Sequence, residues 1–113
     1  MKNSVKLIIV LFFSIISSQT FAQKQPKKVE ITFGVKGECG MCKDRIEKAL
    51  DTKGVLIGEW NQDAKTCRVV FKPKVISEIE IHQLIANLGH DTDKIKATDE
   101  AYKNLHGCCK YQR

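Results

Sequence analysis

Five cysteines are the residues of this chain best suited to chemistry. They form a pair separated by two residues, Cys39 and Cys42, an adjacent pair, Cys108 and Cys109, and one single residue, Cys67. A thiolate attacks disulfides and also binds soft metal ions such as Cu(I). The cysteine number is odd, and the spacing differs from that of a distributed disulfide framework. Redox chemistry, metal binding and simple disulfide bridges all remain open at this point.

The pair Cys39 and Cys42 lies between a predicted strand and a predicted helix. Apolar and polar residues alternate over residues 29–36, which is typical of a half-buried strand. Apolar residues then recur with helical spacing from residue 42 to about residue 53. Free N–H groups and the helix dipole at a helix start favour the thiolate form. The position therefore suits either reactive or metal-binding cysteines.

The remaining elements predict an α+β fold. Residues 55–61 and 66–72 flank a short polar turn and are predicted to form an antiparallel hairpin. A capping-box motif at residues 77–80 opens a second helix that ends at Gly89, and residues 90–97 are predicted to form a weak edge strand. This order predicts a ferredoxin-like βαββαβ sandwich, with an antiparallel sheet and both helices on one face. A short cysteine-containing tail follows, with a short helix capped by Thr98.

The N-terminal region has the pattern of a secretory signal peptide. Lysines flank an apolar run, and small residues precede a predicted cleavage site after Ala22. The uninterrupted apolar stretch, residues 7–13, is far shorter than the roughly 20 residues that span a bilayer. The chain is therefore expected to be exported to the periplasm or secreted. Its predicted parts are a signal peptide at residues 1–22, a basic arm at 23–28, a domain at 29–96 and a tail with vicinal cysteines at 97–113.

With these elements in place, the chain resembles the heavy-metal-associated domain family. This family includes copper chaperones, N-terminal modules of copper ATPases and the periplasmic mercury-binding protein. The resemblance covers about residues 28–96 and rests on Cys39 and Cys42, Gly54-Val55, Phe71-Lys72-Pro73 and Leu88-Gly89-His90. One position differs, because the family's loop has a methionine two residues before its first cysteine. Here that position is Gly37, and Met41 lies between the cysteines.

The resemblance implies that Cys39 and Cys42 bind one soft ion, Cu(I) or Hg(II), as thiolates. Zn(II) fits less well, because two thiolates leave it short of its preferred four ligands. His90 matches a loop position near the metal, where some members have a ligand histidine, and is a further candidate ligand. The implied partner is a metal-transporting membrane protein or another thiol-bearing metal carrier. The chain is expected to be a monomer, with a metal-bridged dimer as the alternative.

The remaining cysteines admit several interpretations. Cys108 and Cys109 either form a vicinal disulfide in an inert tail, or provide thiols that complete the first site or make a second one. Cys67 alternates with apolar residues of its predicted strand, which favours a buried structural residue.

The leading hypothesis is an exported protein that captures and transfers Cu(I) or Hg(II). The alternative is a periplasmic thiol–disulfide oxidoreductase that uses the same cysteine pair, and a small disulfide-stapled interaction domain is a third possibility. The oxidoreductase is disfavoured because no aromatic residue directly precedes Cys39 and the only prolines are Pro26 and Pro73. No catalytic carboxylate pair, Ser/His/Asp set or phosphate loop is evident, so no enzyme is predicted. Export and the absence of interleaved basic and aromatic residues argue against nucleic-acid binding.

Overall fold

Three strands form an antiparallel sheet in the computed structural model, which describes residues 25–113. The strands are β1 (Val29–Gly34), β2 (Val55–Asn61) and β3 (Thr66–Phe71), and β3 lies between the other two. They agree closely with the predicted ranges, because alternation and a tight polar turn are local signals. The predicted signal peptide, residues 1–22, lies outside the described residues.

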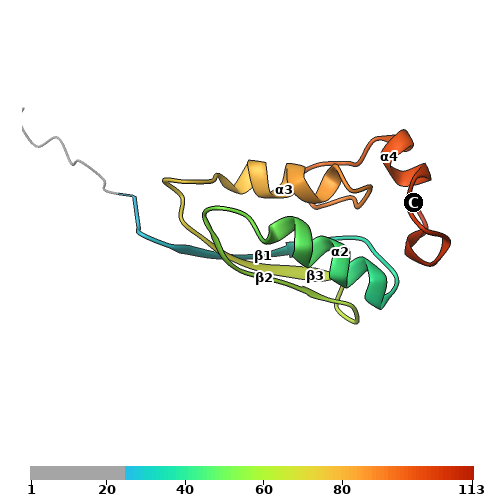
Figure 1. The fold of residues 1–113 in the computed structure, drawn as a ribbon, viewed down its shortest axis with the longest axis horizontal. Coiled ribbons are helices and arrows are strands. Elements are labelled where there is room, and N and C mark those ends of the chain that lie inside the picture. The colour runs from blue at the N-terminus through green and yellow to red at the C-terminus, as the bar shows by residue number, and fades with distance from the viewer. Residues whose placement is uncertain (1–24) are drawn as a thin grey trace, which may run out of the picture.

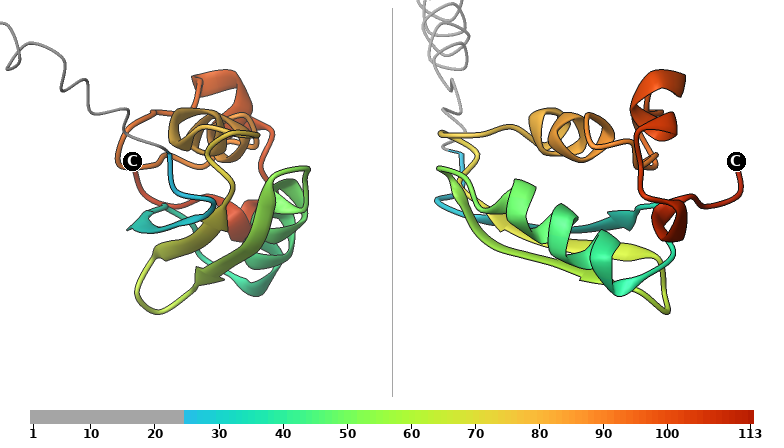
Figure 2. Two further views of the ribbon diagram at one scale, coloured as in Figure 1. Left: turned by 90° about the vertical axis from the view of Figure 1, so that its left-hand side faces the viewer. Right: turned by 45° about the vertical axis from the view of Figure 1, so that its right-hand side comes forward.

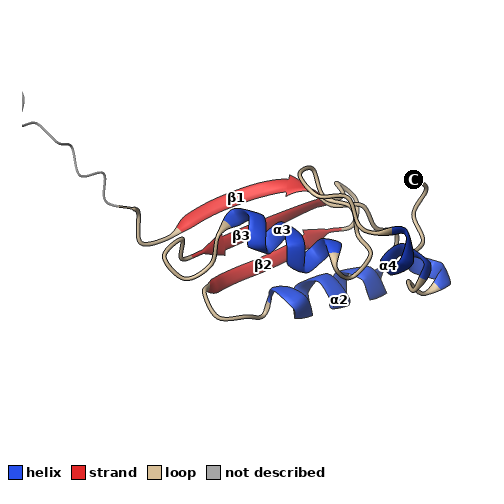
Figure 3. Cartoon of the chain, turned by 90° about the horizontal axis from the view of Figure 1, so that it is seen from above, coloured by secondary structure: helices blue, strands red, loops and turns tan. Residues whose placement is uncertain are grey.

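Two helices, α2 (Gly40–Leu50) and α3 (Glu78–Ala86), cover one face of this sheet (Figures 1 and 3). In α2 the buried residues Cys42, Ile46 and Leu50 recur every four positions, so they form one stripe along the helix. The start of α3 has the predicted capping box, with Ser77 and Glu80 each bonded to the backbone of the other. The α+β ferredoxin-like class is therefore confirmed.

Strand β3 provides the centre of the core. Cys67, Val69 and Phe71 are buried beneath the helices, and Phe33 of β1 lies beside Cys67 in the sheet register. Burial raises the pKa of the Cys67 thiol to about 12, with a further contribution from Glu47. Cys67 is therefore a neutral, buried core residue, as predicted.

The predicted edge strand at residues 90–97 is not formed as a strand in the described part of the chain. Only an isolated bridge joins Thr92 to Val35, just beyond the end of β1. Nearby, the Asp91 carboxylate accepts the Ala97 N–H at 2.7 Å. The Thr92 hydroxyl likewise accepts the Ile95 N–H at 3.0 Å. Side-chain oxygens thus bind backbone N–H groups of this segment, which competes with formation of a strand.

The tail contains α4 (Asp99–Lys103), capped by Thr98 as predicted, and a 3₁₀ turn, η2 (Gly107–Cys109), which lies against α2. The right view of Figure 2 shows this tail at the end of the molecule where α2 begins. Gly89 lies at the exit of α3 with φ +107°, and a Cβ there would come within 2.5 Å of the Ala101 carbonyl. Among residues 25–113, no helix combines the length and apolar character needed to cross a membrane.

Candidate metal centre

Cys39 and Cys42 occupy the start of helix α2. Cys39 is the N-cap residue, with extended backbone, and its side chain makes no capping bond. Its carbonyl accepts the N–H of Cys42 at 3.0 Å, which places Cys42 in the first turn. Cys42 is fully buried and Cys39 is half-buried. One thiol therefore faces the core and the other faces outward from the same turn.

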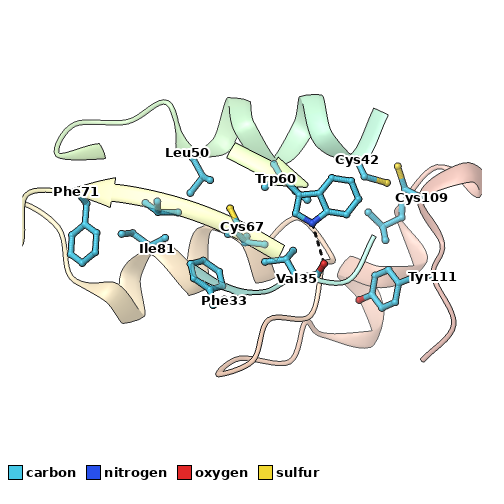
Figure 4. Close-up of a cluster of buried hydrophobic side chains, with 14 residues drawn as sticks. Phe33, Val35, Cys42, Leu50, Trp60, Cys67, Phe71, Ile81, Cys109 and Tyr111 are labelled. Atoms are coloured by element: carbon cyan, nitrogen blue, oxygen red, sulfur yellow. Dashed lines mark hydrogen bonds between the residues drawn. The ribbon is translucent and has the colours of Figure 1, made fainter. Parts of the chain in front are cut away.

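Trp60 of β2 supports the loop before Cys39. Its indole N–H donates to the Val35 carbonyl at 3.1 Å (Figure 4). Its backbone carbonyl accepts the Lys43 ammonium at 2.9 Å. The ring lies directly against Gly37, where a Cβ would come within 2.9 Å of a ring carbon. The tryptophan thus fills the space beside the loop and leaves no room for a larger residue at position 37. Lys43 also pairs with Glu47 at 2.8 Å, so its ammonium is held in the position from which it bonds to the Trp60 carbonyl.

The tail brings two further thiols to the same place. The Sγ of Cys39 lies 3.6 Å from that of Cys42, 3.0 Å from that of Cys108 and 3.6 Å from that of Cys109. The Sγ atoms of Cys39, Cys108 and Cys109 all lie within 4.8 Å of one another. Cys42 and Cys109 point toward one another at the end of the core (Figure 4). All five cysteines lie in the described part of the chain, and all are free thiols.

The four clustered thiols differ in exposure. Cys42 and Cys109 are fully buried, whereas Cys39 is half-buried and Cys108 is exposed. The cluster is therefore closed on its inner side and open along the edge formed by Cys39 and Cys108. Such an arrangement allows another molecule to reach the outer sulfurs while the inner pair stays covered.

His90 is fully buried, but the structure does not bring it into the thiol cluster. Its Nδ1 lies 2.7 Å from the Lys36 carbonyl, and its ring stacks on Tyr111 with centroids 6.0 Å apart. A carbonyl only accepts hydrogen bonds, so Nδ1 carries the proton in the neutral ring. Burial lowers the pKa of His90 and keeps it neutral. Its role as a ligand stays a prediction, and in this structure it packs between the loop and the tail.

The thiol contacts change the acidity of the cluster. The hydrogen bond with Cys108 is the main cause that lowers the pKa of Cys39 to about 6, and the contact with the backbone of Cys42 adds to it. Burial is the main cause that raises the pKa of Cys109, and the contacts with Cys42 and Cys39 raise it further. Cys39 is therefore the thiol most readily ionised, and it is the one at the centre of the cluster.

Alkylation should reveal this thiolate directly. In the reduced chain, iodoacetamide is expected to modify Cys39 first, with a rate that reaches half its maximum near pH 6. Cys108→Ala removes the hydrogen bond and should move this midpoint upward, toward the value of about 8.5 of a free cysteine. Cys67→Ala should leave it unchanged. Mass spectrometry of the labelled peptides measures each rate, and equal midpoints in the chain and in Cys108→Ala would contradict the assignment.

Sequence reasoning missed three residues that hold this centre together. Trp60, which the sequence pattern does not single out, is 1 % exposed and supports the loop. Tyr111 and Arg113 fasten the tail to residues near His90 and were not singled out at all. The signals available were an aromatic residue and an arginine in an otherwise polar tail, which are too common to predict a specific contact.

Solved structures with the same fold include copper-binding domains and a MerP protein. A copper-binding domain from the P-type ATPase HMA7 is 29% identical, with a TM-score of 0.55, and the match covers 57% of this chain and 89% of that one. The copper form of a CopA variant from Bacillus subtilis is 31% identical, with a TM-score of 0.50 and coverages of 57% and 88%. Oxidised MerP from Ralstonia metallidurans is 20% identical, with a TM-score of 0.55 and coverages of 58% and 94%, and supports the fold alone. No family model and no curated protein matches the chain.

Proposed function

Because the chain belongs to the heavy-metal-associated domain family, we propose that it captures a soft metal ion at Cys39 and Cys42 and passes it to another thiol-bearing protein. The observation that carries this proposal is the pair of sulfurs 3.6 Å apart at a helix start, one of which has a pKa lowered to about 6. Thiolates are the ligands that Cu(I) and Hg(II) prefer. The proposed ion is therefore Cu(I) or Hg(II).

The exposure of the two thiols suggests how the ion would leave. A partner thiolate approaches the half-buried Cys39 side and forms a new metal–sulfur bond, so that three sulfurs briefly share the ion. The partner's thiol has lost its proton to solvent before this step. The bond between the ion and Cys39 then breaks and leaves Cys39 as a thiolate, the form that its lowered pKa favours at neutral pH. No electrons are exchanged in this step. The bond between the ion and buried Cys42 breaks last, since the partner reaches this side only after the bond to Cys39 has broken.

We place this exchange outside the cytoplasm, since the sequence predicts export after Ala22. The partner would be a metal-transporting membrane protein or another thiol-bearing carrier. Solved relatives include a domain of a P-type ATPase, which supports a transporter as the partner. In this proposal the protein carries a metal ion as cargo and catalyses no reaction.

Anaerobic titration of the reduced chain with Cu(I) or Hg(II), against a competing chelator, tests this function. Cys39→Ser/Cys42→Ser should weaken binding by about a thousandfold or more, because thiolates supply most of the binding energy of such sites. Cys67→Ala is the matched control and should bind as the unaltered chain does. Unchanged affinity in the double variant would refute the proposal.

The lowered pKa of Cys39 also fits a thiol–disulfide oxidoreductase, since thiolates attack disulfides. An insulin-reduction assay on the same samples separates the two functions. Metal transfer predicts tight binding and no turnover. Sustained turnover without tight metal binding would favour the oxidoreductase.

A further inference from the structure

We propose that Cys108 and Cys109 bind the same ion as Cys39 and Cys42, so that the tail completes a four-thiolate centre for a divalent d¹⁰ cation. This class includes Zn(II), Cd(II) and Hg(II), which accept four sulfur ligands in tetrahedral geometry. The inference rests on the proposed function for the first cysteine pair. It adds two ligands, changes the class of cargo from Cu(I) or Hg(II) to divalent d¹⁰ cations, and removes the objection that Zn(II) lacks ligands here.

The spacing of the sulfurs suits a tetrahedral ion better than a linear one. Metal–sulfur bonds of about 2.3 Å place two sulfurs about 3.8 Å apart in a tetrahedron and about 4.6 Å apart across a linear ion. The observed Sγ separations from Cys39 are 3.0, 3.6 and 3.6 Å. The two separations of 3.6 Å lie close to the edge of a tetrahedron, whereas the Cys39–Cys108 separation of 3.0 Å would lengthen by about 0.8 Å on binding. Cys42 lies outside the group of Sγ atoms that are all within 4.8 Å of one another, so its thiol would also move inward to become the fourth ligand. A linear site at Cys39 and Cys42 would require the pair to move apart by about 1 Å.

Hydrogen bonds of two tyrosines hold the tail in place. The hydroxyl of buried Tyr111 donates to the Gly89 carbonyl at 2.7 Å and accepts the Asp91 N–H at 3.0 Å. The Tyr102 hydroxyl in turn donates to the Tyr111 carbonyl. Cys109 lies only two residues before Tyr111, so these bonds fix the position at which its thiol enters the cluster.

Arg113 makes a second set of contacts that hold the tail in position. Its guanidinium pairs with Asp91 and with Asp99, each at 3.0 Å, and donates to the Ala97 carbonyl at 2.7 Å. It also lies over the ring of Tyr102. The tail thiols are thus held beside Cys39 by contacts that involve no metal. Ligands positioned in advance lose less freedom when an ion binds, which favours tight binding.

Packing alone does not account for both tail cysteines. Cys109 is fully buried and could serve simply as a core residue. Cys108 is exposed and fills no space in the core, yet its sulfur lies 3.0 Å from that of Cys39. A tail that merely covered the core would not need a thiol at this position. The placement of Cys108 therefore favours a ligand role.

Titration with Cd(II) tests the proposal. The sulfur-to-cadmium charge-transfer absorbance of the reduced chain, kept free of oxygen, rises with the number of cadmium–sulfur bonds. We expect one Cd(II) per monomeric chain. Cys108→Ser should retain about three quarters of the absorbance and Cys108→Ser/Cys109→Ser about half, in proportion to the ligands that remain. Cys67→Ala is the control and should retain all of it.

Cys108→Ser alters only an exposed side chain, so it keeps the test valid if the double variant does not fold. Full absorbance in both tail variants would overturn the inference. One Cd(II) shared by two chains, seen as a dimer in sedimentation, would also overturn it. If the tail variants match the unaltered chain while Cys39→Ser/Cys42→Ser loses binding, the inference fails and the proposed function stands. If the unaltered chain binds none of Cd(II), Cu(I) and Hg(II), both fail.

Discussion

Trp60→Ala is expected to lower the free energy of unfolding by about 3–5 kcal/mol, the usual cost of removing a buried aromatic side chain. The indole is 1 % exposed, and it fills the space between the sheet and the loop at Gly37. Small domains have a total stability of about 5–15 kcal/mol, so this loss is a large part of the whole. Urea denaturation followed by far-UV circular dichroism measures it.

The matched control for this variant is Trp60→Phe. Phenylalanine keeps most of the ring but loses the N–H bond to the Val35 carbonyl, so we expect a smaller loss, near 1–3 kcal/mol, from one unsatisfied buried acceptor and a small cavity. The alanine variant should also bind metal more weakly than the phenylalanine variant, because the loop at Gly37 loses its support. Equal losses of stability in the two variants would show that the ring does not hold the loop.

Arg113→Gln is expected to destabilise the chain by about 2–3 kcal/mol at neutral pH. It leaves the Asp91 carboxylate, whose side chain is only 11% exposed, without its main cationic partner. Breaking a fully buried ion pair costs about 3–5 kcal/mol, and partial exposure reduces this figure. Asp99→Asn removes the outer of the two ion pairs, at a carboxylate that is 87% exposed, and should cost less than about 1 kcal/mol.

The effect of Arg113→Gln should depend on pH. Burial raises the pKa of Asp91, but the bonds from Arg113 and the Ala97 N–H outweigh it and lower the pKa below its usual value of 3.8. A carboxyl group whose pKa is lower in the folded chain than in the unfolded chain stabilises the fold at pH values above its unfolded-state pKa. This stabilisation is lost as the pH falls through the folded-state pKa. The stability deficit of Arg113→Gln should therefore be full above about pH 5 and shrink as the pH falls toward 2.

Denaturation curves at several pH values measure this dependence, and removal of bound Cd(II) by a chelator gives a second readout. The tail of Arg113→Gln should release the ion faster than that of Asp99→Asn, although both variants keep all four clustered thiols. A deficit that stays constant with pH, or equal release rates, would mean that the ion pair with Asp91 does not hold the tail.

The elements that sequence alone predicts well are those specified by nearby residues. Strand β2 has the predicted bounds, and α3 begins at the predicted cap, because alternation and the capping box each involve only a few neighbouring positions. The segment at residues 90–97 also has strand-like length, but its conformation depends on the hydrogen bond between the Asp91 carboxylate and the Ala97 N–H. The same carboxylate also pairs with Arg113, which is far along the chain, so the local pattern could not reveal this arrangement.

The candidate site was predictable only in part, for a similar reason. Cys39 and Cys42 follow from the strand-to-helix junction and from the family resemblance. The approach of Cys108 to Cys39 joins positions 69 residues apart, and it depends on fastening by Tyr111 and Arg113. Sequence reasoning therefore raised closure of the site by the tail as one of several alternatives. Only the folded tail shows which thiols meet.

The position of Trp60 gives this protein a built-in optical reporter. It is the only tryptophan in the chain, so all indole fluorescence comes from one place. Its ring touches Gly37 of the cysteine loop, and a Cβ built at Gly37 would lie near both the indole and Cys42. A heavy ion held by these sulfurs would lie close enough to the indole to quench its emission. Loading and release can therefore be followed in real time, without a dye and without altering any cysteine.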